Sequence, residues 1–139
     1  MSRSIKILYG KKGYSLSIKK SWKTTVIRKP KMPLIKSIDK AVTNAFLNPI
    51  NSPSLSNLAK DSKSACILVC DITRPVPNNL FLEKLVNTLV ISGISEDNII
   101  ILIATGLHRP APKKEINQII GSKYILNNIN IVNHFARED

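Results

Sequence analysis

Two short, wholly apolar runs constrain the fold of this chain most. They are ACILVC at residues 65–70 and the apolar part of NIIILIATG at residues 98–106. An apolar run of this length without alternation, bounded by turn residues, is typical of a strand buried on both faces of a parallel sheet. NINIVNH at residues 128–134 reads as a third strand. We therefore expect a parallel sheet in the C-terminal part of the chain.

The segments between these runs are predicted to be helices. In residues 78–93, Leu82, Leu85, Val86 and Leu89 form one apolar stripe after an Asn cap, and Gly93 follows at the expected end. Residues 108–121 predict a second helix, with Pro110 or Pro112 near its first turn and Gly121 at its end. The order strand–helix–strand–helix–strand predicts an α/β fold, a Rossmann-like parallel sheet with right-handed crossovers.

A hairpin and a helix are predicted before this sheet. Residues 4–21 alternate with period two around the turn from Gly10 to Gly13, which favours a β-hairpin. RKPKMP at residues 28–33 is typical of a linker, and Ser37 is placed to cap a helix that reaches Leu47. We expect a single domain over 1–139, made of a basic hairpin and linker (1–33) and an α/β core (34–139).

Basic residues concentrate at the N-terminal end. Residues 1–40 hold 12 Lys and Arg and one acid, Asp39, whereas the rest of this chain of net charge +12 is nearly balanced. With Trp22, Tyr9 and Tyr14 interleaved, this segment raises the hypothesis of a nucleic-acid-binding module. A solvated, lysine-rich hairpin is the favoured alternative, because no recognised nucleic-acid motif frames these residues. Nucleic acid is therefore not an expected partner.

Neither a signal peptide nor an apolar stretch long enough to span a membrane is evident, so a cytoplasmic location is expected. Cys66 and Cys70 lie four apart in an expected strand, roughly 13 Å from one another, which is too far for a disulfide. We expect both to be small buried hydrophobes in a reducing compartment. Two cysteines and two separated histidines lack the usual ligand spacings, so no metal site is predicted.

Polar residues follow each predicted strand, where ligands collect in parallel sheets. They are Asp71, Thr73 and Arg74 after the first strand, Thr105, Gly106, His108 and Arg109 after the second, and Asn133 and His134 after the third. If the first two strands are neighbours, then Asp71, Arg74 and His108 converge on one crevice. Together they would supply a guanidinium for an anion, a titratable imidazole and a carboxylate that orients either.

Each of these residues has a structural alternative. Asp71 can cap the turn that follows it, or form a local ion pair with Arg74. His108 can belong to a loop that caps the next helix, and His134 is expected to be structural or incidental. Neither glycine-rich phosphate-binding motif occurs in the sequence, which disfavours nucleotide binding by those routes.

Two of these segments together resemble a known family. DITRPVP (71–77), followed by ILIATGLHRP (101–110), resembles the N-terminal domain of the lactate racemase family, the nickel-pincer-nucleotide-dependent 2-hydroxyacid racemases and epimerases. LNPINSPSLSNLAK (47–60), the hairpin and the late IVNH fit the same domain in order and spacing. The resemblance covers most of the chain.

The resemblance implies roles for individual residues. His108 would be one of two acid/base residues at the substrate carbinol, and Arg74 would contact the substrate. Asp71, Ile72, Thr73 and Arg74 would lie beside the substrate and the cofactor. In the family, hydride passes from the α-carbon of a small 2-hydroxyacid to the pyridinium ring of the nickel pincer nucleotide while a histidine removes the hydroxyl proton.

Members of the family are much longer. Their further part carries the lysine that links the cofactor, the nickel-ligand histidine and the second acid/base histidine. We therefore expect the family's C-terminal domain to be absent, no cofactor to be held covalently by this chain, and the chain to be inactive by itself. Whether the chain is an excised domain, a truncated product or a subunit of a split enzyme stays open, as does the identity of the substrate. A non-catalytic domain that binds small carboxylates is the remaining alternative.

Overall fold

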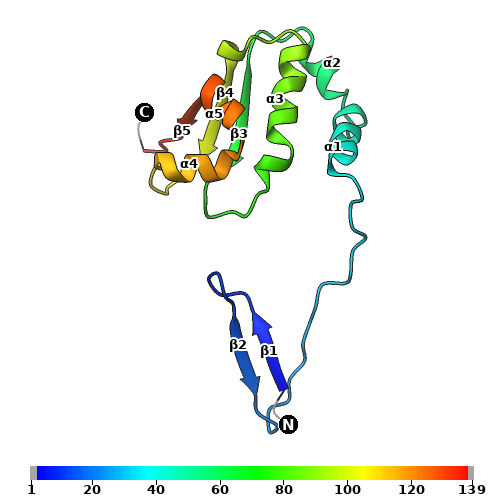
Figure 1. The fold of residues 1–139 in the computed structure, drawn as a ribbon, viewed down its shortest axis with the longest axis vertical. Helices are drawn as coiled ribbons and strands as arrows, with labels where there is room; N and C mark the ends of the chain where they lie inside the picture. The colour runs from blue at the N-terminus through cyan, green and yellow to red at the C-terminus, as the bar shows by residue number, and fades with distance from the viewer. Residues whose placement is uncertain (1–2, 138–139) are drawn as a thin grey trace. The chain divides into compact units, whose positions relative to one another are not determined.

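The computed structural model describes residues 3–137, which form two compact units that divide between Leu34 and Ile35. Figure 1 shows the elements of both in chain order. Within the described residues, no helix is both long enough and apolar enough to cross a membrane. That the two units belong to one functional domain stays a prediction.

The first unit contains the predicted hairpin. Strand β1 (Arg3–Ile7) pairs antiparallel with β2 (Tyr14–Ile18), in a register that joins Arg3 to Ile18. Its turn is closed by a hydrogen bond of 3.0 Å from the Gly13 N–H to the Tyr9 carbonyl. Of the ten strand residues only Ile18 is buried, which fits the period-two pattern on a hairpin with little core of its own.

The second unit is built on the predicted parallel sheet. Its strands β3 (Ala65–Cys70), β4 (Ile99–Ala104) and β5 (Asn130–Asn133) lie in the order β3-β4-β5, all parallel. The last paired residues are Cys70 with Ala104, and Ile103 with Asn133. The carboxyl ends of the three strands therefore meet at one edge of the sheet, as the expected Rossmann-like arrangement requires.

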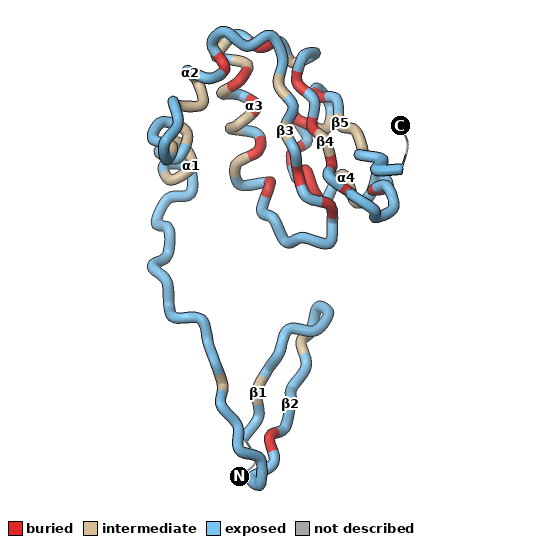
Figure 2. The backbone as a smooth tube through the Cα atoms, turned by 180° about the vertical axis from the view of Figure 1, so that it is seen from behind, coloured by how far each residue is buried: buried red, intermediate tan, exposed pale blue. Residues whose placement is uncertain are grey.

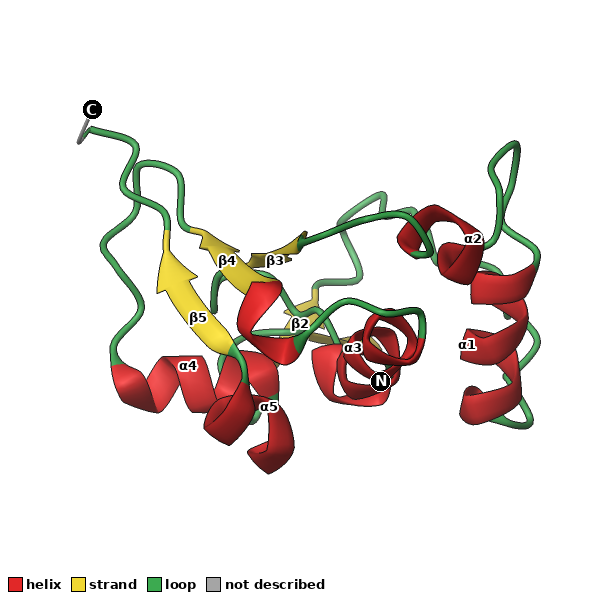
Figure 3. Cartoon of the chain, turned by 90° about the horizontal axis from the view of Figure 1, so that it is seen from above, coloured by secondary structure: helices red, strands yellow, loops and turns green. Residues whose placement is uncertain are grey.

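Helices α3 (Leu82–Ile91), α4 (Lys113–Ile120) and α5 (Lys123–Asn128) cover one face of this sheet (Figure 3). Helix α2 (Leu55–Ala59) contacts α3, and α1 (Ile38–Leu47) contacts α2. An ion pair between Lys84 and Asp39 also ties α3 to α1. Two 3₁₀ turns, Asn78–Leu80 and Glu96–Asn98, precede α3 and β4. Figure 2 shows buried positions along α3 and the strands it covers. The fully buried side chains include Leu82, Val86, Ile99, Ile101, Ile103, Ile120 and Ile125.

The other face of the sheet is open among the described residues, so the expectation of strands buried on both faces was wrong. On β3, Val69 is buried, whereas Cys66, Leu68 and Cys70 are exposed, Leu68 to 67%. The two cysteines are therefore not buried hydrophobes. Both crossovers run in the same direction along the sheet, and right-handed connections of that kind place their helices on the same face.

The helix boundaries match the prediction in part. Ser37 caps α1 as expected, by accepting from the Lys40 N–H at 3.4 Å. Asn78 does not cap α3, because the 3₁₀ turn intervenes; its buried amide instead donates to the Ile119 carbonyl at 3.0 Å. Pro112 stands directly before the first turn of α4, as predicted, whereas α5 was not predicted.

We expect Gly121→Ala to be more destabilising than Gly106→Ala. Both glycines are left-handed, with φ of +67° and +58°, so alanine is strained at either position. Only at Gly121 would the added Cβ also meet another atom, the Asn79 Cβ at 2.7 Å. We expect each variant to lose about 1 kcal/mol of unfolding free energy from backbone strain, and Gly121→Ala to lose roughly 1–3 kcal/mol more from overpacking. Urea unfolding followed by circular dichroism measures both, and equal losses would contradict the contact with Asn79.

Candidate functional site

Two turns lie side by side where β3 and β4 end. Because Cys70 and Ala104 are the last paired residues, the chain leaves both strands at the same level. After β3, the Arg74 N–H donates to the Asp71 carbonyl at 3.1 Å. After β4, the His108 N–H donates to the Thr105 carbonyl at 3.0 Å. Each strand thus turns over four residues, and the two turns carry most of the predicted site residues.

The Asp71 carboxylate joins the two turns. Its Oδ1 accepts from the Thr73 N–H at 3.2 Å and from the Thr73 hydroxyl at 2.6 Å. Its Oδ2 lies 2.6 Å from Nδ1 of His108. Asp71 therefore caps its own turn, as one alternative held, and also contacts His108. The other alternative, an ion pair between Asp71 and Arg74, is not formed within residues 3–137.

The hydrogen bonds to Asp71 fix its charge state. The Thr73 hydroxyl and, after it, the His108 ring lower the pKa of the Asp71 carboxyl below its ordinary value, against the opposing effect of desolvation. An ionised carboxylate can only accept hydrogen bonds, so Nδ1 of His108 carries the proton and donates a hydrogen bond to Asp71. The Asp71 side chain is 10% exposed, whereas that of His108 is 56% exposed. Nε2 of His108 is thereby left as the ring nitrogen that can exchange a proton.

A cavity of about 290 Å³ adjoins this pair. It is lined by Asp71, Ile72, Thr73, His108, Arg109, Ala111 and Glu115. Ile72, whose side chain is 41% exposed, adds apolar surface to a wall that otherwise offers an imidazole, a carboxylate and a hydroxyl. A cavity with a few convergent polar groups and apolar lining suits a small organic molecule.

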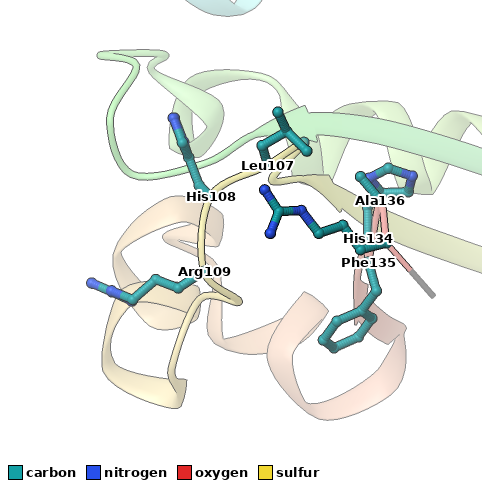
Figure 4. A pocket seen from close by; sticks show the side chains of 8 residues that line it. Leu107, His108, Arg109, His134, Phe135 and Ala136 are labelled. Carbon is teal, nitrogen blue, oxygen red and sulfur yellow. The ribbon is translucent and has the colours of Figure 1, made fainter.

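A second cavity, of about 180 Å³, lies on the other side of the loop that carries His108. Figure 4 shows Leu107, His108 and Arg109 on one side of it and His134 and Phe135 on the other. In this view His108 and Arg109 leave the loop in different directions, and His108 points toward the turn after β3. His134 is thus near the site, although it does not join the Asp71–His108 pair.

The two arginines of the turns differ in how they are held. The Arg109 guanidinium makes two hydrogen bonds to the Glu115 carboxylate, at 2.6 and 3.2 Å, which raises the pKa of Arg109. Arg74 is exposed, takes part in no ion pair among the described residues, and does not line either cavity beside His108. Of the predicted residues, Asp71, Ile72, Thr73 and His108 come together, while the Arg74 side chain does not join them.

Two residues near the site had no predicted role. Glu115, in the first turn of α4, is the partner of Arg109, and Asn133, at the end of β5, bonds to the backbone of Ala111. The position of Asn133 after a strand was the one signal in the sequence. Residues 3–137 contain no group of three or more His, Cys, Asp or Glu side chains that could hold a metal ion.

Comparison with known proteins places these observations in a family. The profile of the family described as lactate racemase N-terminal domain matches residues 9–139. A lactate racemase of Lactiplantibacillus plantarum is 36% identical over 103 residues, which are 74% of this chain and 24% of that protein. A lactate racemase of Thermoanaerobacterium thermosaccharolyticum is 36% identical over 86 residues, 62% of this chain and 20% of its own length.

A solved structure agrees with the sequence matches. The lactate racemase apoprotein from Thermoanaerobacterium thermosaccharolyticum superimposes with a TM-score of 0.78 and 28% identity, over 98% of this chain and 31% of that one. The chain spans about a quarter of the length of the curated relatives it matches (24% and 20%). The fold and these matches agree, and the chain belongs to the family of the lactate racemase N-terminal domain.

Proposed function

We propose that this chain supplies one acid/base side of a racemase or epimerase acting on a small 2-hydroxyacid. The observation that carries the proposal is the 2.6 Å contact between Nδ1 of His108 and the ionised Asp71, beside a cavity of about 290 Å³. This contact places a partly exposed imidazole, in a fixed tautomer, in the lining of the cavity. The names of the relatives support the assignment to lactate racemisation.

His108 exchanges the proton of the substrate hydroxyl in this proposal. With Nδ1–H donated to Asp71, the neutral ring has its lone pair on Nε2, which accepts the hydroxyl proton as the α-carbon loses hydride. The imidazolium that forms is stabilised by the adjacent carboxylate. In the reverse direction it returns the proton to the 2-oxoacid, while the second acid/base residue, which the resemblance assigns to the rest of the enzyme, exchanges the hydroxyl proton of the opposite enantiomer. Asp71 acts through His108: its two oxygens are already occupied by Thr73 and His108.

Arg74 binds the substrate carboxylate in this proposal. A guanidinium fork matches a carboxylate with two parallel hydrogen bonds. Arg109 lines the cavity but already pairs with Glu115, whereas the exposed Arg74 has no ion-pair partner in the described part of the chain. Arg74 is three residues after Asp71 in the same turn. In this proposal its long side chain extends to a ligand bound near His108.

The exposed apolar side chain of Ile72 and the turn from Asp71 to Arg74 fit one wall of a site for the nickel pincer nucleotide. When bound, that cofactor would supply reversible acceptance of the α-hydrogen as hydride. Ile72 would exclude water from the reacting carbon, and Asp71 would keep the His108 ring oriented toward the hydroxyl. In this proposal, metal ligation and covalent attachment of the cofactor belong to the remainder of the enzyme, as the resemblance to the family implies.

The partner in this proposal is the polypeptide that corresponds to the rest of the relatives, joined in cis or bound in trans. The matched solved racemase has 69% of its chain outside the region covered here, since the match covers 31% of it. The open face of the sheet, formed by Cys66, Leu68, Cys70, Ile100 and Ala104, is apolar and exposed. Parallel sheets are normally covered on both faces, so this surface suits the added polypeptide.

A chimera tests the site assignment. In it, this chain replaces the matching segment of the Lactiplantibacillus lactate racemase, and the enzyme is loaded with nickel cofactor. We expect His108→Ala to lower kcat for lactate roughly 10²–10⁴-fold, because general acid/base catalysis contributes that much. We expect Arg74→Ala mainly to raise KM. Arg28→Ala, which removes an exposed arginine of the first unit, is the matched control. Chiral chromatography of the lactate measures turnover, and variants as active as the control would contradict the assignment.

The pH dependence of stability tests the state of Asp71. Its folded pKa lies below the ordinary value of about 3.9, so its stabilising contribution is present above that value and lost as the pH falls through the folded pKa. As the pH falls from about 4 through the folded pKa, wild type should therefore lose more unfolding free energy than Asp71→Asn. Thr73→Val, which removes the hydroxyl that contributes most to lowering the Asp71 pKa, should lie between them. Urea unfolding at each pH measures these losses, and equal losses of unfolding free energy in the three proteins would rule this account out.

Thiol labelling tests the open face. Cys66 and Cys70 are both exposed on it, so both should react with a soluble thiol reagent in the native 139-residue chain nearly as fast as in the unfolded chain. In the chimera the added polypeptide should protect both thiols. Mass spectrometry of the labelled peptides reads each cysteine separately, and equal labelling in the chimera would show that the sheet face stays uncovered.

A further inference from the structure

The end of β5 is tied to the loop that carries His108 through a side-chain amide. Oδ1 of Asn133 accepts from the Ala111 N–H at 2.8 Å, and Nδ2 of Asn133 donates to the Ala111 carbonyl at 3.2 Å. The carboxamide therefore satisfies both backbone groups of one residue, as a neighbouring strand would. Ala111 is 6% exposed, so losing Asn133 would leave two buried polar groups without their partner.

The next residue of the chain holds the other end of the same loop. The His134 N–H donates to the Ile103 carbonyl at 3.0 Å, and the buried Thr105 hydroxyl donates to the His134 carbonyl. Asn133 and His134 thus contact the chain on both sides of His108, at Thr105 before it and at Ala111 after it. Residues 106–110, which lie between these two attachments, are all exposed.

This arrangement matters for His108 because little else holds it. Its ring is 56% exposed and depends on one hydrogen bond to Asp71, and its N–H bonds within the same loop, to Thr105. The nearby Arg109–Glu115 ion pair lies at the surface, with the Arg109 side chain 65% exposed, and exposed pairs contribute little. The half-buried amide of Asn133, which makes two hydrogen bonds to the buried Ala111, is therefore the stronger attachment on the C-terminal side of His108.

We propose that Asn133 is a positioning residue for His108. Asn133 makes no hydrogen bond to His108 and does not line the cavity beside Asp71. It acts by holding the Thr105–Ala111 loop in the position where Nδ1 of His108 contacts Asp71. Only the catalytic meaning of this position rests on the proposed function. The hydrogen bond itself can be followed without any turnover, so failure of the racemase assignment and failure of this inference are distinguishable.

Nuclear magnetic resonance of the ¹⁵N-labelled full chain tests the inference. In wild type the neutral His108 ring should be the Nδ1–H tautomer, with Nε2 unprotonated, and the Ala111 amide should exchange slowly with solvent. In Asn133→Ala the ring should change to a mixture of both tautomers, because its loop is no longer held where Nδ1 meets Asp71. The Ala111 amide should exchange about tenfold faster or more. Asn130→Ala, an exposed asparagine of the same strand, is the matched control and should change neither.

A second variant guards against a failure to fold. Asn133→Asp keeps the volume and the acceptor for the Ala111 N–H but cannot donate to the Ala111 carbonyl, so it should give an intermediate tautomer mixture. In the racemase chimera, Asn133→Ala should lower kcat roughly 10²-fold with little change in KM, as misplacement of a catalytic group does. An unchanged His108 tautomer in either Asn133 variant, or the same change in Asn130→Ala, overturns the inference.

Discussion

The parallel pairing of β3 with β4 is the interaction on which the site depends. Its register ends at Cys70 with Ala104, so the residues that follow leave the sheet at one level and turn over equal lengths of chain. Asp71 and His108 are separated by 37 residues in sequence, yet their side chains meet at 2.6 Å for this reason. A register shifted by one residue would turn every side chain of β3 to the opposite face and move Asp71 away from His108.

The Asp71 carboxylate then links stability to site geometry. A nearly buried anion needs hydrogen-bond donors, and this one has three, two from Thr73 and one from His108. These hydrogen bonds offset the cost of burying the carboxylate. The one to His108 also determines which nitrogen of the His108 ring carries the proton. A site residue that is largely exposed thereby takes its orientation from one that is not.

Much of this could be predicted from the sequence, because it depends on local patterns. The apolar runs indicated the strands, the apolar stripe indicated α3, and the prolines with Gly121 indicated α4. The polar residues after each strand indicated where Asp71 and His108 would meet. The roles of Asn78 and Asn133 could not be predicted, since their partners Ile119 and Ala111 lie 41 and 22 residues away in sequence. No local signal distinguishes an asparagine that caps a helix from one that bonds to a distant backbone.

The open face of the sheet shows a different limit of pattern reasoning. An apolar run such as ACILVC indicates that both faces are suited to burial, but it carries no information on which polypeptide covers them. Here the helices of the described residues cover one face, and Leu68 is left 67% exposed on the other. Likewise, the residue pattern showed two arginines near the site, but it could not show that Arg109 is already paired with Glu115 in the folded chain.

The attachment of the His108 loop at both of its ends has a thermodynamic consequence for ligand binding. Thr105 and Ala111 are fixed by hydrogen bonds within the protein, so the conformational entropy of the backbone between them is reduced when the chain folds. A ligand that reaches His108 meets a largely preorganised loop and has less disorder to remove on binding. Its affinity then reflects direct contacts more than loop ordering.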